Sequence, residues 1–179
     1  MPVLRTRLAF ITGSAIFVAM PLRRMVLCAL AVLAALPAGA LAARAPWATM
    51  NICDTAANPD TAGVRGSMPG IAGAQLFMRF QLQLQRNDGS WRALGAADSG
   101  FIALGRARGR AMRQAGHSFV LSPPPAGQVY TVRGLVTFEW RAKDGTLLRS
   151  ARRATTDGHR STAGADPAGF SAAECAIAT

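Results

Sequence analysis

An alternating stretch, residues 74–85, constrains the fold of this chain more than any other feature. Every second residue in it is apolar, and all but one of the residues between them are polar or charged. A period of two over this length predicts a strand with one buried face and one solvated face, because a helix would need apolar spacings of three and four. The apolar positions are Ala74, Leu76, Met78, Phe80, Leu82 and Leu84.

A second alternating stretch spans residues 129–141, and its apolar set is Tyr130, Val132, Val136, Phe138 and Trp140. A slip of one residue in either strand would turn its apolar set towards water. We therefore expect the two apolar sets to share one interior. The arginines at 79, 133 and 141 should then lie on outer faces.

Turn residues divide the chain at regular intervals. Asn87-Asp88-Gly89-Ser90 and Lys143-Asp144-Gly145-Thr146 suit tight hairpins, because Asn, Asp and Gly tolerate the left-handed backbone conformation. We expect return strands at 91–94 and 147–154, and further strands at 47–53, 101–104, 117–122 and 170–177. Residues 54–70 and 95–100 are expected to form loops, since the first of these segments is rich in Ala, Gly, Pro and Asp.

Residues 106–113 are compatible with an edge strand, in which the arginines at 106, 108 and 110 would line one face and discourage aggregation. The spacing predicts about seven to eight short strands, with turns roughly every ten residues and no helix after the N-terminal segment. The expected fold class is all-β, a single antiparallel sandwich.

A short part of the chain resembles a known family. Leu121, the following proline run and Tyr130-Thr131-Val132 at the start of a long strand resemble the tyrosine corner of immunoglobulin and fibronectin type III sandwiches. The resemblance covers about twenty residues and implies an immunoglobulin-like sandwich. The antibody pattern is not followed. The candidate disulfide cysteines, Cys53 and Cys175, lie near the two ends of the expected domain, and no Trp lies centrally between two core cysteines. The chain is also similar to small secreted proteins of actinobacterial type.

The N-terminal residues 1–42 have the character of an export signal. Residues 20–25 include two arginines, residues 26–36 are an apolar run, and Pro37 and Gly39 interrupt a helix. Ala40-Leu41-Ala42 fits the small-residue pattern that signal peptidase cleaves. We therefore expect a cut between Ala42 and Ala43, which leaves residues 43–179 as one exported β domain.

Two alternatives to this processing stay open. The leader is nearly long enough to span a bilayer and to be kept as an anchor. Residues 1–19 carry their own arginines and apolar run, so the chain could start at Met1 or at Met20. In either case the expected location is outside the cytoplasm, either secreted or at the cell surface, and membrane contact is expected only through this segment.

The cysteines agree with export. Cys28 lies in the apolar run and would be removed with it, which leaves Cys53 and Cys175 near the two ends of the domain. An even pair in an oxidising compartment predicts a disulfide, although two unrelated thiols remain the alternative. The bridge would place the two Cα atoms within about 7 Å and would contribute roughly 4–5 kcal/mol by closing a long loop.

The chain is basic, with 20 Lys and Arg against 9 Asp and Glu. Net positive charge favours contact with anionic polymers and surfaces. If their strands adjoin, two arginine clusters would form one patch for phosphate or carboxylate groups, and the alternative is a solvated face. No nucleic-acid partner is expected, because reading helices and aromatic platforms are missing. The clusters are Arg106, Arg108, Arg110 and Arg113, and Arg149, Arg152 and Arg153.

No set of residues has the spacing of a catalytic, cofactor or metal site. Asp157, His159 and Ser161 alternate in one loop, but a triad needs its base between nucleophile and acid, and no nucleophile elbow is present. His117, His159, Asp157 and Glu174 lack paired-ligand spacing, and residues 54–60 lack a calcium-loop pattern.

These observations favour a non-enzymatic extracellular or cell-surface binding module of unknown ligand, with an anionic polymer or a cell-envelope component as candidate partners. The alternatives are a structural envelope protein without a discrete ligand and an anionic-polymer-binding protein that uses its arginine-rich face. An enzyme of unrecognised type is the last alternative. A deep pocket with convergent polar groups would favour the enzyme.

Overall fold

A computed structural model describes residues 45–159 and 163–178. The expectations for the leader, Cys28, the cleavage site and the start of the chain lie outside these residues, as does Ser161. Within the described ranges, no helix is long and apolar enough to span a membrane.

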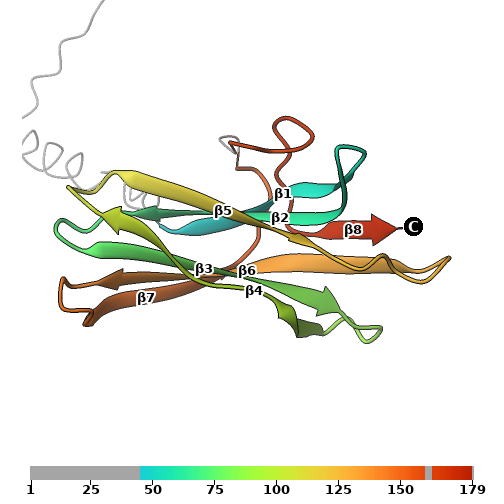
Figure 1. Cartoon of the computed structure of the whole chain (residues 1–179), viewed down its shortest axis with the longest axis horizontal. Coiled ribbons are helices and arrows are strands. Elements are labelled where there is room, and N and C mark those ends of the chain that lie inside the picture. Colours follow the sequence, from blue (N-terminus) through green and yellow to red (C-terminus); the bar gives the residue numbers. More distant parts are fainter. Residues whose placement is uncertain (1–44, 160–162, 179) are drawn as a thin grey trace, which may run out of the picture. The chain divides into compact units, whose positions relative to one another are not determined.

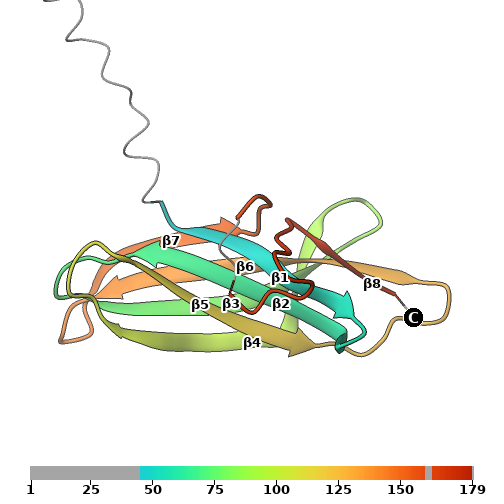
Figure 2. The same cartoon turned by 90° about the horizontal axis from the view of Figure 1, so that it is seen from above.

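The described residues form two antiparallel sheets that lie face to face (Figures 1 and 2). The smaller sheet has the strand order β1-β2-β5. The larger has the order β4-β3-β6-β7, and β8 also pairs with β6. The expected all-β antiparallel sandwich is confirmed. The strands are β1 (Trp47–Thr55), β2 (Asn58–Pro69), β3 (Gln75–Gln85), β4 (Trp91–Arg106), β5 (Met112–Val120), β6 (Val129–Arg141), β7 (Leu147–Ala154) and β8 (Cys175–Ala178).

Strands β3 and β6 pair at the centre of the larger sheet. Their register sets Met78 opposite Phe138 and Leu76 opposite Trp140, and all four side chains are fully buried. The Trp140 indole Nε1 donates a hydrogen bond to the Pro69 carbonyl at 2.7 Å, which ties the larger sheet to the end of β2. The shared interior expected from the two alternating stretches is confirmed.

The expectation of a loop over residues 54–70 was wrong, because β2 occupies most of this segment and forms the middle of the smaller sheet. Its small residues are required by close packing. A Cβ atom on Gly66 would lie 3.1 Å from the Met78 Sδ and 3.2 Å from the Phe138 ring. Tertiary contact therefore outweighs the poor strand preference of Gly and Ala here.

Strand β4 is one irregular strand where two short strands separated by a loop were expected. Gln81 pairs with Asp98 and Gln83 pairs with Ala93, so residues 94–97 of β4 lie opposite a single residue of β3 and bulge from the ladder. The expected edge strand over 106–113 was also wrong. Arg106 ends β4, Arg113 lies in β5, and residues 107–111 connect the two strands.

The predicted disulfide is confirmed. Cys53 of β1 and Cys175 of β8 are bonded, with their Cα atoms 5.4 Å apart and a sequence separation of 122. Because β1 belongs to the smaller sheet and β8 pairs within the larger one, the bond holds the two sheets together. A disulfide of this kind is typical of proteins outside the cytoplasm.

Described residues between β7 and β8, on both sides of 160–162, cover the free edge of β1. Thr156 N donates to the Ala48 carbonyl, and Met50 and Ala172 exchange two backbone hydrogen bonds. At the start of β1 the His159 ring stacks on Trp47 with centroids 4.1 Å apart. The unpaired backbone of this edge strand is thereby protected.

Removal of the disulfide should destabilise the domain. In Cys53→Ser/Cys175→Ser, we expect the free energy of unfolding, measured by denaturant titration, to fall by about 2–5 kcal/mol, because the unfolded chain regains the entropy of a long loop. A reducing agent should lower the stability of the wild type to the same level and leave the variant unchanged. Equal denaturation midpoints for the oxidised wild type and the variant would contradict this.

Replacement of Gly66 by a larger residue should destabilise the domain, because the two sheets are in close contact at this position. We expect Gly66→Val to lower the free energy of unfolding by about 1–3 kcal/mol through overpacking. Gly95→Val is the matched control, since a Cβ at Gly95 meets no atom within 4 Å. A Gly66 variant as stable as the Gly95 variant would show that the sheets are not in close contact at this point.

Candidate binding surfaces

The outward side chains of the larger sheet form a mostly polar surface, here called the outer face. Side chains alternate along a strand, so the residues between the buried positions of β3 and β6 point away from the interior. The register aligns Gln83 with Arg133 and Phe77 with Glu139 across these two strands. Its members include Phe77, Arg79, Gln81, Gln83, Trp91, Asp98, Phe101, Arg133, Glu139, Arg141 and Arg152.

Arginines of the outer face lie against aromatic rings from other strands. The Arg133 Cζ is 4.2 Å from the centroid of the Trp91 ring. The Arg141 Cζ is 4.5 Å from the Phe77 centroid and 4.9 Å from that of Phe101. Cation–π contact restricts a long flexible side chain and holds its guanidinium group in place. The outward direction of these arginines was predicted correctly, but the aromatic partners were not.

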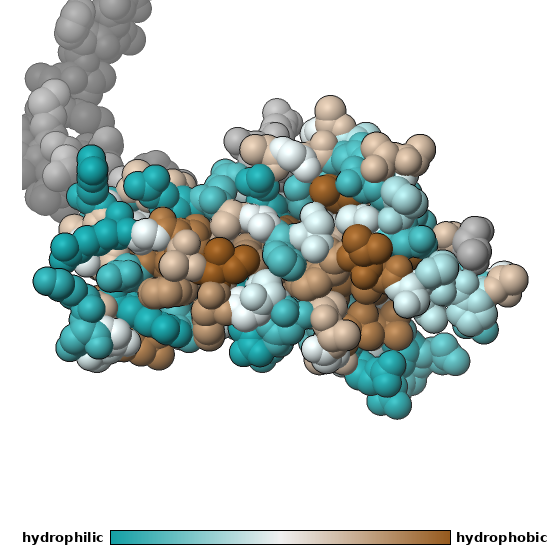
Figure 3. Space-filling view, viewed as in Figure 1, coloured by the Kyte–Doolittle hydropathy of each residue, from teal (hydrophilic) through white to brown (hydrophobic). Residues whose placement is uncertain are grey.

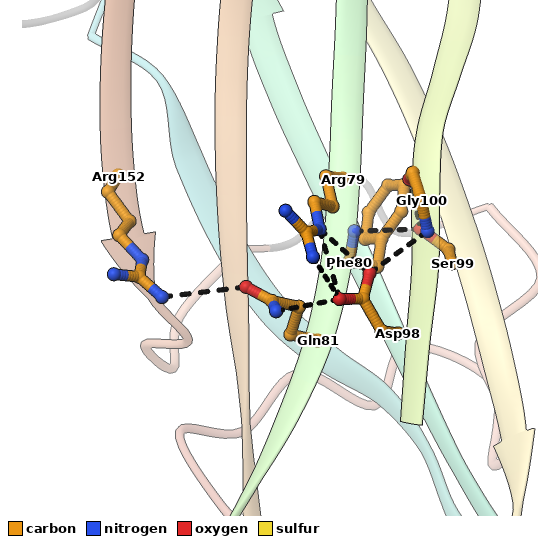
Figure 4. Close-up of polar contacts among 7 residues, drawn as sticks. All are labelled: Arg79, Phe80, Gln81, Asp98, Ser99, Gly100 and Arg152. Carbon is orange, nitrogen blue, oxygen red and sulfur yellow. Dashed lines mark hydrogen bonds and ion pairs between the residues drawn. The ribbon is translucent and has the colours of Figure 1, made fainter. Parts of the chain in front are cut away.

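A network around Asp98 joins β3 and β4 on the outer face (Figure 4). Arg79 Nε donates to Asp98 Oδ1 at 2.8 Å, and Gln81 Nε2 donates to Oδ2 at 2.9 Å. Gly100 N also donates to Oδ1, at 3.0 Å. These donors, Arg79 above all, lower the pKa of Asp98 to about 2. In return, the hydrogen bond to Asp98 raises the pKa of Arg79, so this pair is neutralised internally.

The remaining charges of the outer face are not balanced. Arg141 is paired with Glu139, whereas Arg133 and Arg152 have no carboxylate partner in the part of the chain that the structure describes. Arg133 Nε donates to Gln83 Oε1 at 2.9 Å, and Arg152 Nη2 lies 3.5 Å from Gln81 Oε1. Both guanidinium groups are therefore available to an anion, and that of Arg133 is held in place.

The seven arginines singled out in the sequence are divided between different surfaces. Five lie around one end of the sandwich: Arg106, Arg108, Arg110, Arg113 and Arg149. Among these, Arg110 and Arg149 line one hollow of about 470 Å³ together with Ile71. Arg152 belongs to the outer face because it pairs with Thr137. Arg153 follows it in β7 and therefore points to the other side of the strand.

The two histidines are separated by the fold. His159 is stacked on Trp47, its Nε2 lies 2.9 Å from the Thr156 hydroxyl, and burial lowers its pKa. His117 lies in β5 with its ring against Phe119. Among residues 45–159 and 163–178, no three metal-ligating side chains form a group.

The carboxylates near the β1–β2 turn contact backbone and side-chain donors. Asp54 accepts hydrogen bonds from Asp60 N at 2.8 Å and from Ala178 N at 3.2 Å. Asp166 accepts from Thr55 and from Asn58 Nδ2, which lowers its pKa. These contacts stabilise the turn and the segment that leads to β8.

Two further hollows were not predicted. One, of about 510 Å³, lies between the bulge of β4 at 94–97 and residues 118–122, which are the end of β5 and the two residues after it; apolar surface is visible on this side of the domain (Figure 3). The other, of about 330 Å³, includes Asn51 and Arg65. The Arg65 Nε is buried without a hydrogen-bond partner among the described residues, and burial lowers its pKa. Both depend on strand contacts that the sequence pattern did not reveal.

Comparisons of the sequence with known protein families and with curated proteins find no match. The surfaces described above therefore carry the inference about function.

Acid should weaken the fold partly through Asp98. Its pKa in the folded state, about 2, lies below the ordinary value of 3.8, so its contacts stabilise the fold above about pH 4 and this contribution is lost as the pH falls towards 2. Asp98→Asn should lower the free energy of unfolding by up to about 1–2 kcal/mol at neutral pH, since the group is partly solvated.

The gap in unfolding free energy between wild type and Asp98→Asn should therefore narrow as the pH is lowered from 5 to 2 in denaturant titrations. Arg79→Gln should give a similar pattern, because it removes the main donor. A difference in unfolding free energy that stays constant between pH 5 and pH 2 would contradict the stabilising role of ionised Asp98.

Proposed function

We propose that this chain is an exported, non-enzymatic binding module of the extracellular space or cell surface, and that its outer face binds an anionic polymer of the cell envelope. The observation that carries the proposal is the pair Arg133 and Arg152, which have no carboxylate partner among the described residues. The two-sheet architecture is compatible with an immunoglobulin-like module, a fold that assigns no function by itself. The disulfide between Cys53 and Cys175 supports a location outside the cytoplasm.

The spacing of the two cations favours a polymer over a single small anion. Arg152 pairs with Thr137, which lies four residues from Arg133 along β6. The two positions are therefore separated by roughly 13 Å along the strand. A chain with repeating carboxylates or phosphates can reach both, and each guanidinium group can bind such an anion with two hydrogen bonds.

The fixed position of Arg133 also supports binding. Arg133 is held by the Trp91 ring and by Gln83, so less side-chain freedom is lost when an anion binds. The carboxylates support a non-enzymatic role. Asp98 is held by Arg79 and Glu139 by Arg141, so neither is free to act as a general base.

Adsorption to immobilised polygalacturonate tests the proposal. We expect the wild type to bind at low salt and to be released as salt is added. Arg133→Gln/Arg152→Gln should weaken binding on the order of ten-fold or more, because two charge-assisted contacts are lost. The matched control is Arg86→Gln/Arg153→Gln, which removes the same charge from exposed positions off the outer face and should bind nearly as well as the wild type.

Equal weakening in both double variants would assign the adsorption to overall charge and would overturn the role of the outer face. If the wild type binds neither polygalacturonate nor polyphosphate at low salt, the binding function itself fails, and a structural envelope protein without a discrete ligand replaces it.

A further inference from the structure

One end of the sandwich, here called the basic tip, gathers three turns that are distant in sequence. They connect β2 to β3 (residues 70–74), β4 to β5 (107–111) and β6 to β7 (142–146), and they lie together at the left in Figures 1 and 2. Trp47 pairs with Ser67 near the end of β2. The chain therefore enters the domain near the same end.

The basic tip is strongly positive. Six cations of this end have no carboxylate partner among the described residues: Arg106, Arg108, Arg110, Arg113, Lys143 and Arg149. The three turns of the tip contain one carboxylate, that of Asp144, which accepts a hydrogen bond from Thr146 N in its own turn. The neighbouring Glu139 is already paired with Arg141. The excess of positive charge is therefore free to attract an anionic partner.

The same end is also apolar. The described residues include seven large hydrophobic side chains that are exposed, and four of them lie at this tip: Ile71, Met112, Leu147 and Leu148. The two leucines are each 53% exposed. Apolar and cationic groups are adjacent, since Ile71, Arg110 and Arg149 line one hollow. Single exposed apolar residues are ordinary in soluble proteins, but a group of them at one end indicates a contact surface.

We propose that the basic tip docks on the surface of an anionic lipid bilayer. The arginines would bind lipid phosphates, and the apolar side chains would enter the boundary between headgroups and acyl chains. A soluble anionic polymer would pair with the arginines but would leave the apolar side chains in water. A bilayer accommodates both kinds of group, and this combination favours the lipid surface.

The place where the chain enters the domain supports this orientation. Residues 1–44, which precede the described part, contain the apolar runs expected to lead the chain to a membrane. They join the domain at Ala45, two residues before Trp47 and hence near the tip. Membrane contact was expected only through this leader; the tip adds a second contact that belongs to the folded domain and does not require the leader to be kept.

Vesicle flotation tests the proposal with a chain that starts at Ala43, so that the leader cannot contribute. Leu41–Thr179 is a compact unit by itself, and such a chain holds every described residue. The probes are vesicles of phosphatidylcholine alone and vesicles in which phosphatidylglycerol replaces a third of the lipid. We expect binding to the anionic vesicles, falling with added salt, and little binding to the neutral ones.

Two tip variants separate the charged from the apolar contribution. Arg108→Gln/Arg110→Gln should weaken partitioning onto anionic vesicles by about ten- to thirty-fold, because each arginine near such a surface contributes roughly five-fold. Leu147→Ser/Leu148→Ser should weaken it several-fold through lost apolar burial. All four side chains are exposed, so thermal unfolding should show little change in stability.

Each tip variant has a matched control elsewhere on the domain. Arg86→Gln/Arg153→Gln removes the same charge, and Val120→Ser/Val129→Ser removes two exposed apolar residues, 78% and 57% exposed, at the opposite end. Both controls should bind vesicles nearly as well as the wild type. Arg133→Gln/Arg152→Gln should also keep vesicle binding, so failure of the polymer site and failure of the tip are distinguishable.

Equal binding to neutral and anionic vesicles, or no binding to either, would overturn the proposal. The leucine variant is equally decisive. If it binds anionic vesicles as well as the wild type while the tip arginines are needed for polygalacturonate binding, the tip is an anionic-polymer site and not a membrane-docking surface.

Discussion

The close contact between the two sheets is the constraint on which the other features of the domain depend. Bulky side chains of β3 and β6, among them Phe138 and Met78, pack directly onto β2 at Gly66. That contact fixes which side of each strand points inward, because a slip of one residue would expose the apolar set. The positions of Arg133, Arg152 and the other outward residues follow from it.

Much of the fold could be predicted because its signals are local. The alternation in 74–85 and 129–141 and the turn at 143–146 lie within one or two strands, and β3, β6 and β7 agree with the expectation closely. The cysteine pair was predictable because only Cys53 and Cys175 lie outside the segment expected to be the export signal. Strand β2 was missed because its small residues are required by close contacts with other strands, which the local sequence does not reveal. The bulge in β4 has no local sequence signal either.

The candidate surfaces could be predicted only in part. The alternating pattern of the two stretches predicted the outward direction of Arg79, Arg133 and Arg141. It did not reveal that Trp91 lies under Arg133, because that contact joins two strands that are not paired with each other. Likewise, Arg110 and Arg149 line one hollow although they are distant in sequence. Such groupings arise from the order of strands in the sheets, which the local pattern does not contain.

The two proposed surfaces would support each other. The long strands end at the basic tip, so docking of the tip would stand the strands upright on a bilayer and leave the outer face exposed above it. A polymer attached to the same envelope would then meet the outer face at a raised effective concentration, and moderate affinities at each surface would suffice. The positive charge of the domain would also speed both encounters at low ionic strength.

Hydroxyl-radical footprinting of the wild-type domain tests this division of roles most directly, because side chains of both surfaces react with the radical. Anionic vesicles should protect Met112, Leu147 and Leu148 and leave Trp91 reactive. Polygalacturonate should protect Trp91 and Phe101 and leave the tip reactive. Protection of the same residues by both partners, or of neither set, would contradict the account.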